Sequence, residues 1–161
     1  MKRLAIMLGV SAIATAALAQ TAPALDARTA QAIINGCAAH ATAKNQSHAI
    51  AVVDSGGHLI AASRMDGNGY GIMDFALAKA RAVAAWGFPT SGMAEAVKST
   101  PGFAAAPHVV TVAGGVPVFS SDGHTRIGGI GVSGEAPEDD AACAMAGIAA
   151  AGLRSGRAAT G

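Results

Sequence analysis

The stretch AIAVVDSGGHLIAASRMDG, residues 49–67, constrains the fold of this chain more than any other. Two short apolar runs, Ile50–Asp54 and Leu59–Arg64, flank the turn sequence SGGH. Apolar runs of this length around a glycine-containing turn predict an antiparallel β-hairpin. The second run leads into Asp66, so charged side chains stand where the chain leaves the sheet. They either bind a ligand or solvate the strand end.

The first 19 residues have the organisation of a secretory signal peptide. Lys2 and Arg3 form a basic start, an apolar region follows, and Ala17-Leu18-Ala19 matches an A-x-A cleavage site. The apolar region is shorter than the roughly 20 residues that a membrane-spanning helix needs. We therefore expect cleavage after Ala19 and a single mature domain of residues 20–161. It would be periplasmic or secreted, with no membrane insertion of the mature chain.

The charge of the mature chain limits its partners. Removing residues 1–19 takes away two of the 11 Lys and Arg residues and none of the 10 Asp and Glu residues. Nine basic residues then face ten acidic ones, so no basic surface for nucleic acid is expected. Only 13% of the residues are charged, and apolar surface on such a chain is commonly covered by subunit contacts. We therefore expect a homo-oligomer.

Hydrophobic periodicity predicts helices on both sides of the hairpin. Asp26 is a candidate N-cap for a helix that ends near Lys44. One face of that helix is formed by Ala30, Ile33, Ile34, Cys37 and Ala41. Further segments are predicted in chain order: helices at 72–86 and 91–98, strands at 109–113, 116–120 and 126–132, and a helix at 137–153. This order predicts an α+β domain with a five-stranded, mainly antiparallel sheet flanked by helices.

Two motif-like patterns carry no function by themselves. GIGVSG at 129–134 matches the dinucleotide pattern G-x-G-x-x-G, but the chain has no room for the strand that should follow the next helix. We interpret it as a strand end packed closely against the last helix.

The five histidines show no H-x-H, H-x-x-H or H-E-x-x-H spacing, which leaves only a metal site assembled from distant residues. His108, at the entrance of a predicted strand, is the histidine best placed for a ligand; a solvated loop histidine is the alternative.

Two other features leave alternatives open. Cys37 and Cys143 lie on or near the apolar faces of the first and last helices, where they either form a disulfide in an oxidising compartment or remain buried thiols. Lys79 lies within the apolar arc of the 72–86 helix. Its ammonium either reaches solvent past a packed stem or faces a pocket or subunit contact, where Arg64 could join it on an anionic ligand.

Four segments in order resemble the GlcG/HbpS-like family, which is also called haem-degrading. They are AVVDSGGHLIAASRMDG, LAKARAVAAW, GGVPV and IGGIGVSGEAPEDD, and the resemblance spans residues 25–153. It implies a profilin-like fold, a homo-oligomer that is often an octamer, haem or iron as cofactor, and a membrane sensor as partner. It also implies that Arg64, Asp66, Lys79 and His108 contact a haem-like anion or a subunit.

Three functional hypotheses follow. The first is an exported, oligomeric haem- or iron-porphyrin-binding protein in haem handling or redox sensing, with Arg64 and Lys79 on the propionates. The second is an enzyme or accessory protein that acts on a small organic acid in a catabolic pathway, with Asp66 or Asp122 as base. The third is a non-catalytic protein that signals to a membrane sensor. No catalytic residue or iron ligand is assigned, so enzymatic activity stays open.

Overall fold

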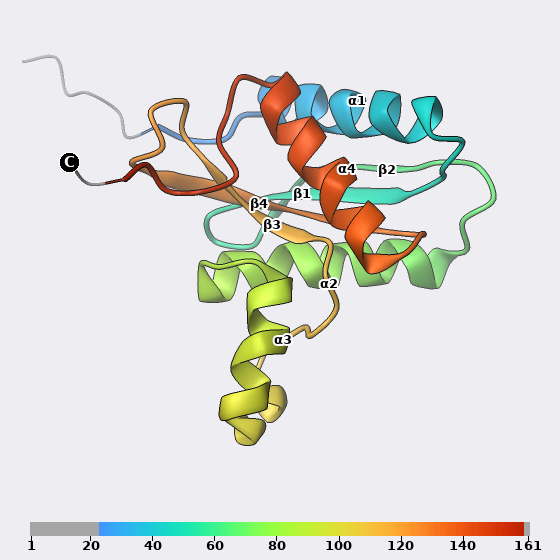
Figure 1. Cartoon of the computed structure of the whole chain (residues 1–161). Helices are drawn as coiled ribbons and strands as arrows, with labels where there is room; N and C mark the ends of the chain where they lie inside the picture. The colour runs from blue at the N-terminus through green and yellow to red at the C-terminus, as the bar shows by residue number, and fades with distance from the viewer. Residues whose placement is uncertain (1–22, 160–161) are drawn as a thin grey trace, which may run out of the picture.

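The computed structural model describes residues 23–159 and shows one antiparallel sheet between two layers of helices (Figure 1). The signal-peptide prediction lies outside these residues. The elements in chain order are α1 (Ala27–Ala43), β1 (Ala49–Asp54), β2 (Leu59–Arg64), α2 (Tyr70–Trp86), α3 (Thr90–Ser99), the 3₁₀-helix η1 (Pro101–Ala105), β3 (Gly115–Phe119), β4 (Arg126–Ser133) and α4 (Pro137–Ala150). Among residues 23–159, no helix is both long and apolar enough to cross a membrane.

The sheet has the strand order β2-β1-β4-β3, and all neighbouring strands are antiparallel. The predicted hairpin is confirmed as β1 and β2, with Ala49 opposite Arg64. Its turn is closed by the Asp54 carboxylate, which accepts hydrogen bonds from the backbone N–H groups of Gly56 at 2.8 Å and His58 at 2.9 Å. An Asp at the start of a turn favours this side-chain closure.

The prediction of five strands is wrong, because residues 109–113 form no strand. The backbone of Gly114 has a φ of 118°, which lies in the left-handed region that favours glycine. Its carbonyl accepts from the Val132 N–H at 2.9 Å, so pairing with β4 begins only here and the preceding chain turns away. The outer side of β3 instead meets the C-terminal segment, where Phe119 N–H donates to the Arg154 carbonyl at 2.8 Å. The result is a four-stranded α+β domain; the profilin-like description stays a prediction.

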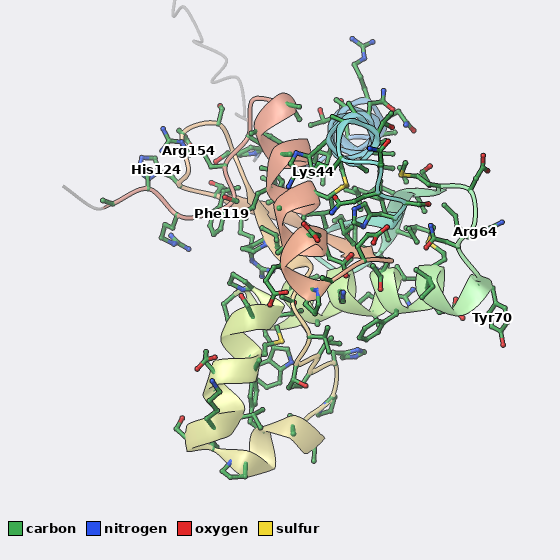
Figure 2. All side chains as sticks on the ribbon, turned by 45° about the vertical axis from the view of Figure 1, so that its right-hand side comes forward. Lys44, Arg64, Tyr70, Phe119, His124 and Arg154 are labelled. Carbon is green, nitrogen blue, oxygen red and sulfur yellow. A yellow bond between two sulfur atoms is a disulfide. The ribbon has the colours of Figure 1, made fainter. Side chains whose placement is uncertain are left out.

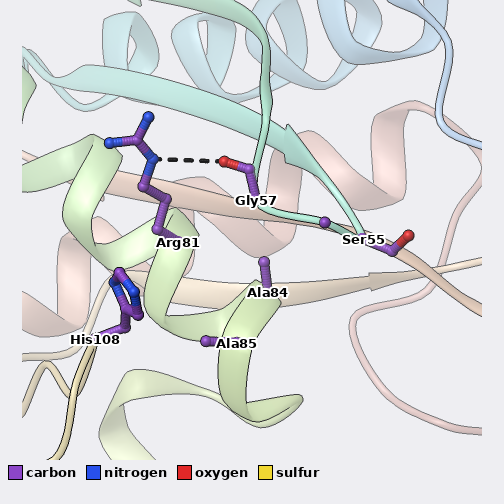
Figure 3. A pocket seen from close by; sticks show the side chains of 7 residues that line it. Ser55, Gly57, Arg81, Ala84, Ala85 and His108 are labelled. Atoms are coloured by element: carbon purple, nitrogen blue, oxygen red, sulfur yellow. Dashed lines mark hydrogen bonds between the residues drawn. The ribbon is translucent and has the colours of Figure 1, made fainter.

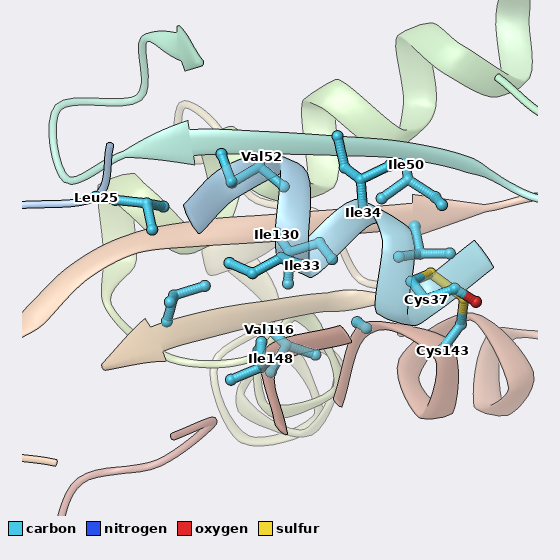
Figure 4. Packing of buried hydrophobic residues seen from close by; sticks show 14 of the residues in the cluster. Leu25, Ile33, Ile34, Cys37, Ile50, Val52, Val116, Ile130, Cys143 and Ile148 are labelled. Atoms are coloured by element: carbon cyan, nitrogen blue, oxygen red, sulfur yellow. A yellow bond between two sulfur atoms is a disulfide. The ribbon is translucent and has the colours of Figure 1, made fainter. Parts of the chain in front are cut away.

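Helices α1 and α4 cover one face of the sheet, α2 covers the other, and α3 with η1 projects away from α2 (Figure 1). The predicted apolar face of α1 is confirmed, since all five of its residues are buried. The core between the sheet and α1/α4 includes Ile33, Ile34, Ile50, Val52, Ile130 and Ile148 (Figure 4). A smaller core of alanines and Val53 lies under α2.

The GIGVSG segment packs against a different helix from the one expected. Gly131 on β4 lies directly under α2, where a Cβ atom would collide with the Ala76 carbonyl and the Ala80 nitrogen. A side chain at Gly129 would likewise crowd the Ala80 carbonyl. The glycines therefore let α2, rather than α4, lie close to the sheet.

The structure decides between the two states of the cysteines. Cys37 on α1 and Cys143 on α4 form a disulfide, with Cα atoms 4.7 Å apart (Figure 4). The two helices approach closely here because Gly147 of α4 packs on the Ile33 carbonyl and on Cys37. The bond therefore joins the first and last helices of the described chain on one face of the sheet.

Candidate functional site

The exposed face of α2 borders two adjoining hollows of about 310 and 440 Å³, both lined by Arg81 and His108. Pockets of this size fall at the lower end of the range for small ligands. We call the two together the α2 groove. Its other lining residues are Ser55, Gly56, Gly57, Asp74, Leu77, Ala78, Ala84, Ala85, Val109 and Val110. The groove thus lies between α2, the β1–β2 turn and the segment that follows His108.

His108 enters the groove from a strained backbone. Its φ of 61° places it in the left-handed region, which is uncommon for residues other than glycine and recurs at functional sites. The preceding residue, Pro107, is held by Trp86, whose indole Nε1–H donates to the Pro107 carbonyl at 3.0 Å. Trp86 is in turn packed edge-on against Phe103, with ring centroids 4.8 Å apart. An aromatic contact between α2 and η1 therefore positions the imidazole.

Arg81 supplies a cation to the same groove. Its Nε–H donates to the Gly57 carbonyl at 3.4 Å, a long hydrogen bond that directs the guanidinium along the hairpin turn (Figure 3). The terminal nitrogens make no hydrogen bond with any other residue of 23–159 and are available to a ligand. Figure 3 shows Arg81 and His108 on the same side of α2, with Ala84 and Ala85 on the next turn. The groove thus combines a cation and an imidazole with a mainly apolar lining.

Lys79 does not face this groove. It is fully buried on the opposite side of α2, and its Nζ donates to Asp140 Oδ2 and to the Val132 carbonyl, each at 2.8 Å. The ammonium therefore neither reaches solvent nor meets a ligand, and it is not part of the site that we propose. The position of Lys79 within the apolar arc was readable from the sequence; the full burial of its ammonium was not, since solvent or a pocket or subunit contact was expected. The partner was not, because the acidic residues at 138–140 all suit the first turn of a helix.

His48 completes a buried charged cluster that sequence reasoning missed. Its Nδ1 lies 3.1 Å from Asp140 Oδ1, and the side chain is fully buried just before β1. The Nε2 atom has no hydrogen-bond partner among the described residues. We call His48, Lys79 and Asp140 the buried triad; it joins β1, α2 and α4 inside the protein. Only their tertiary contact distinguishes these residues from ordinary polar ones.

Arg64 and Asp66 lie at another edge of the molecule. Arg64 is exposed near the N-terminal end of α2 (Figure 2), and its Nη1 donates to the Asn68 carbonyl. Asp66 is exposed, and its backbone carbonyl accepts from the Ser47 hydroxyl at 2.6 Å. Neither residue lines the α2 groove. Of the four predicted ligand contacts, the structure places only His108 there and adds Arg81, which lies in the segment LAKARAVAAW.

The proposed catalytic base Asp122 serves a turn instead. Its carboxylate accepts from the Ser120 hydroxyl and from the His124 N–H, which hold the pKa of the carboxyl below its ordinary value of 3.8. A carboxylate with a lowered pKa is a weak base. Within residues 23–159, no group of three His, Cys, Asp or Glu side chains is arranged to hold a metal ion.

Known proteins match this chain over most of its length. The family model described as "Haem degrading protein HbpS-like" matches residues 25–149. The chain belongs to this family. It is 40% identical to protein GlcG of Escherichia coli strain K12 over 110 residues, which is 68% of this chain and 81% of GlcG. The resemblance seen in the sequence is thereby confirmed.

The fold of this HbpS-like protein agrees with the folds of two solved structures. A double mutant of Streptomyces reticuli HbpS has 28% identity and a TM-score of 0.73, covering 88% of this chain and 97% of the other. The crystal structure of a PduOC:heme complex has 24% identity and a TM-score of 0.75, covering 84% and 100%. At 24% identity, the comparison with PduOC shows a shared fold.

Proposed function

We propose that this chain is an exported haem- or iron-porphyrin-binding protein that holds its ligand in the α2 groove. The observation that carries the proposal is that one groove is lined by His108, on a strained backbone, and by Arg81, whose terminal nitrogens have no hydrogen-bond partner among residues 23–159. Membership of the HbpS-like family and the haem bound by PduOC, a protein of the same fold, support the choice of ligand.

The residues of the groove fit an iron porphyrin. The imidazole of a histidine such as His108 is a common iron ligand. A guanidinium such as Arg81 pairs with carboxylates through two parallel hydrogen bonds and would hold a propionate. The side chains of Leu77, Val109 and Val110 provide apolar contact for the ring. When bound, the haem supplies redox-active iron; the protein residues bind and orient it.

The wider role follows from the compartment. Export after cleavage at Ala19 would place the groove where haem is captured or stored, or where its redox state is read. A homo-oligomer, octameric by resemblance, and a membrane sensor as partner complete this proposal. No observation at the groove favours an enzyme of organic acids, since Asp66 lies elsewhere and Asp122 belongs to a turn.

Hemin titration of the purified mature protein tests the site. We expect a saturable Soret shift, weakened at least tenfold in affinity by His108→Ala and by Arg81→Gln. Trp86 is the only tryptophan of the chain and borders the site, so its fluorescence should be quenched in parallel. His124→Ala and Arg64→Gln are matched controls, because they remove an exposed histidine and an exposed arginine outside the groove.

The outcomes separate the alternatives. Wild-type affinity in both groove variants would reject the α2 groove, and loss of affinity in Arg64→Gln alone would move the ligand to the end of β2. No saturable shift at micromolar protein would reject haem binding. Export is tested separately by the intact mass of the protein recovered from cells that express the full chain. A species beginning at Gln20 supports the proposal, and one that retains residues 1–19 contradicts it.

A further inference from the structure

The two ends of the α2 groove carry opposite charges. Asp74 and Arg81 both line the hollow of about 440 Å³, whereas the hollow of about 310 Å³ beside the hairpin turn is lined by Arg81 but not by Asp74. Residues seven positions apart are separated by about two helical turns, so the two side chains lie on one face of α2, about 10 Å apart along its axis. The groove therefore runs from an acidic end at Asp74 to a basic end at Arg81 and the turn.

Neither charge is paired with another residue of the described chain. No ion pair within residues 23–159 includes Asp74 or Arg81, and the Asp74 side chain is exposed. The first turn of α2 contains no acidic residue, and Asp74 comes after it, where the positive end of the helix dipole has little effect. The charge of Asp74 therefore acts on what lies in the groove rather than on a partner within the protein.

The carboxylate at the other end of the groove is already engaged by its own turn. Asp54 accepts hydrogen bonds from the backbone N–H groups of Gly56 and His58 and lies 3.2 Å from the His58 imidazole. Among the described residues that line the groove, Asp74 is the only acidic one. It is thus the carboxylate that a ligand in the groove meets.

Apolar side chains separate the two charged ends. Leu77 and Ala78 lie on α2 between Asp74 and Arg81, and the segment that follows His108 lines the same hollow with two valines. A carboxylate on a ring held here is attracted to Arg81 and repelled by Asp74. A flat ligand is therefore bound best when all its carboxylates are on one edge, which then faces Arg81.

We propose that Asp74 makes the α2 groove selective for porphyrins whose carboxylates are confined to one edge, an inference that rests on the proposed haem function. Hemin belongs to this class, because its propionates share one edge and its vinyl groups lie elsewhere on the ring. Iron coproporphyrin III has further propionates in place of the vinyl groups, so a carboxylate would face Asp74. Two like charges about 5 Å apart in water lower an affinity about fourfold.

Soret titrations of both porphyrins compare wild type with Asp74→Asn. We expect this variant to bind iron coproporphyrin III about threefold to tenfold more tightly than wild type does, and hemin within about twofold of wild type. Asp74→Glu keeps the charge and should retain the wild-type preference. Asp66→Asn is the matched control, since Asp66 is exposed and lies outside the groove. The gain should shrink at about 1 M salt, where the screening length is about 3 Å.

The outcomes separate this inference from the proposed function. A gain for iron coproporphyrin III that is confined to Asp74→Asn and is lost at high salt supports the selectivity. Saturable hemin binding overturns the selectivity, and leaves the haem function standing, if Asp74→Asn shows no gain, an equal gain for both porphyrins, or the same gain as Asp66→Asn. A gain that persists undiminished at high salt also contradicts it. No saturable binding of either porphyrin by wild type overturns both.

Discussion

The buried triad offers the sharpest test of the packing, through replacement of Lys79 by methionine. This change keeps most of the side-chain volume and removes the ammonium that lies 2.8 Å from Asp140. Asp140 would keep its contact with His48 and its hydrogen bond from the Glu135 N–H at 3.2 Å. It would lose its ion pair with the Lys79 ammonium. The Val132 carbonyl would also lose a donor. We therefore expect a large loss of stability with the fold retained.

The size of the loss follows from the geometry. Two unit charges 2.8 Å apart attract by about 6 kcal/mol at an effective dielectric constant of about 20. Desolvation of the two ions offsets most of this attraction in the native protein, so the pair as a whole contributes little. Removing one partner leaves the desolvation of the other uncompensated, which costs about 3–5 kcal/mol. This is a large share of the roughly 5–15 kcal/mol by which domains are stable.

Urea unfolding of a double-mutant cycle measures the coupling. Lys79→Met and Asp140→Leu should each destabilise strongly, whereas the double variant should lose at least about 2 kcal/mol less than the sum of the two. The exposed pair Lys98–Glu95 has nearly the same separation, 2.7 Å against 2.8 Å, and is the matched control. Lys98→Met should cost less than about 1 kcal/mol. Additive effects of the buried variants within about 0.5 kcal/mol would refute an interaction between the two side chains.

Three further predictions concern other parts of the protein. The double variant Cys37→Ala/Cys143→Ala should lose about 2–5 kcal/mol of unfolding free energy in non-reducing urea titrations, because the disulfide closes a loop with a sequence separation of 106 residues; an unchanged midpoint would contradict it. The pKa of the Asp54 carboxyl is lowered from 3.8, mainly by the hydrogen bond from the His58 N–H. The stabilisation of the fold by the ionised carboxylate is therefore present above pH 3.8 and is lost as the pH falls through the lowered pKa of the folded protein. The advantage of wild type over Asp54→Asn in urea should therefore be larger at neutral pH than in acid, and a constant difference would disagree. Trp86→Phe removes the donor that holds the backbone before His108 and should weaken hemin binding about threefold to tenfold in Soret titrations; unchanged affinity would remove Trp86 from the site.

Local sequence patterns predicted most elements because each depends on nearby residues. Asp26 caps α1 by accepting from the Thr29 N–H at 2.8 Å, and Gly87 ends α2 with a left-handed φ of 81°. Both signals need only a few neighbouring residues. The prediction of a strand at 109–113 was wrong, because a run of β-branched residues does not show whether the sheet has a free edge for that strand to pair with. The left-handed Gly114 and the C-terminal segment on β3 decided that.

The candidate site was predicted less well than the fold. His108 was identified from its position between a proline and an apolar run, and the structure places it at the α2 groove. Arg81 was not recognised as a ligand contact, because most arginines on the polar side of a helix are only solvated. Arg64 and Asp66 are close to each other in sequence but lie away from the groove.

The sequence alone determined the family, the buried face of α1 and the β1–β2 hairpin, since all of these follow from order and periodicity along the chain. Only the tertiary structure decided which charged residues meet. Lys79 and Asp140 are 61 residues apart and share one buried contact, whereas Arg81, two residues from Lys79, faces the opposite side. The physical reason is helix geometry: residues two apart on a helix point in nearly opposite directions, so one enters the core and the other borders the groove.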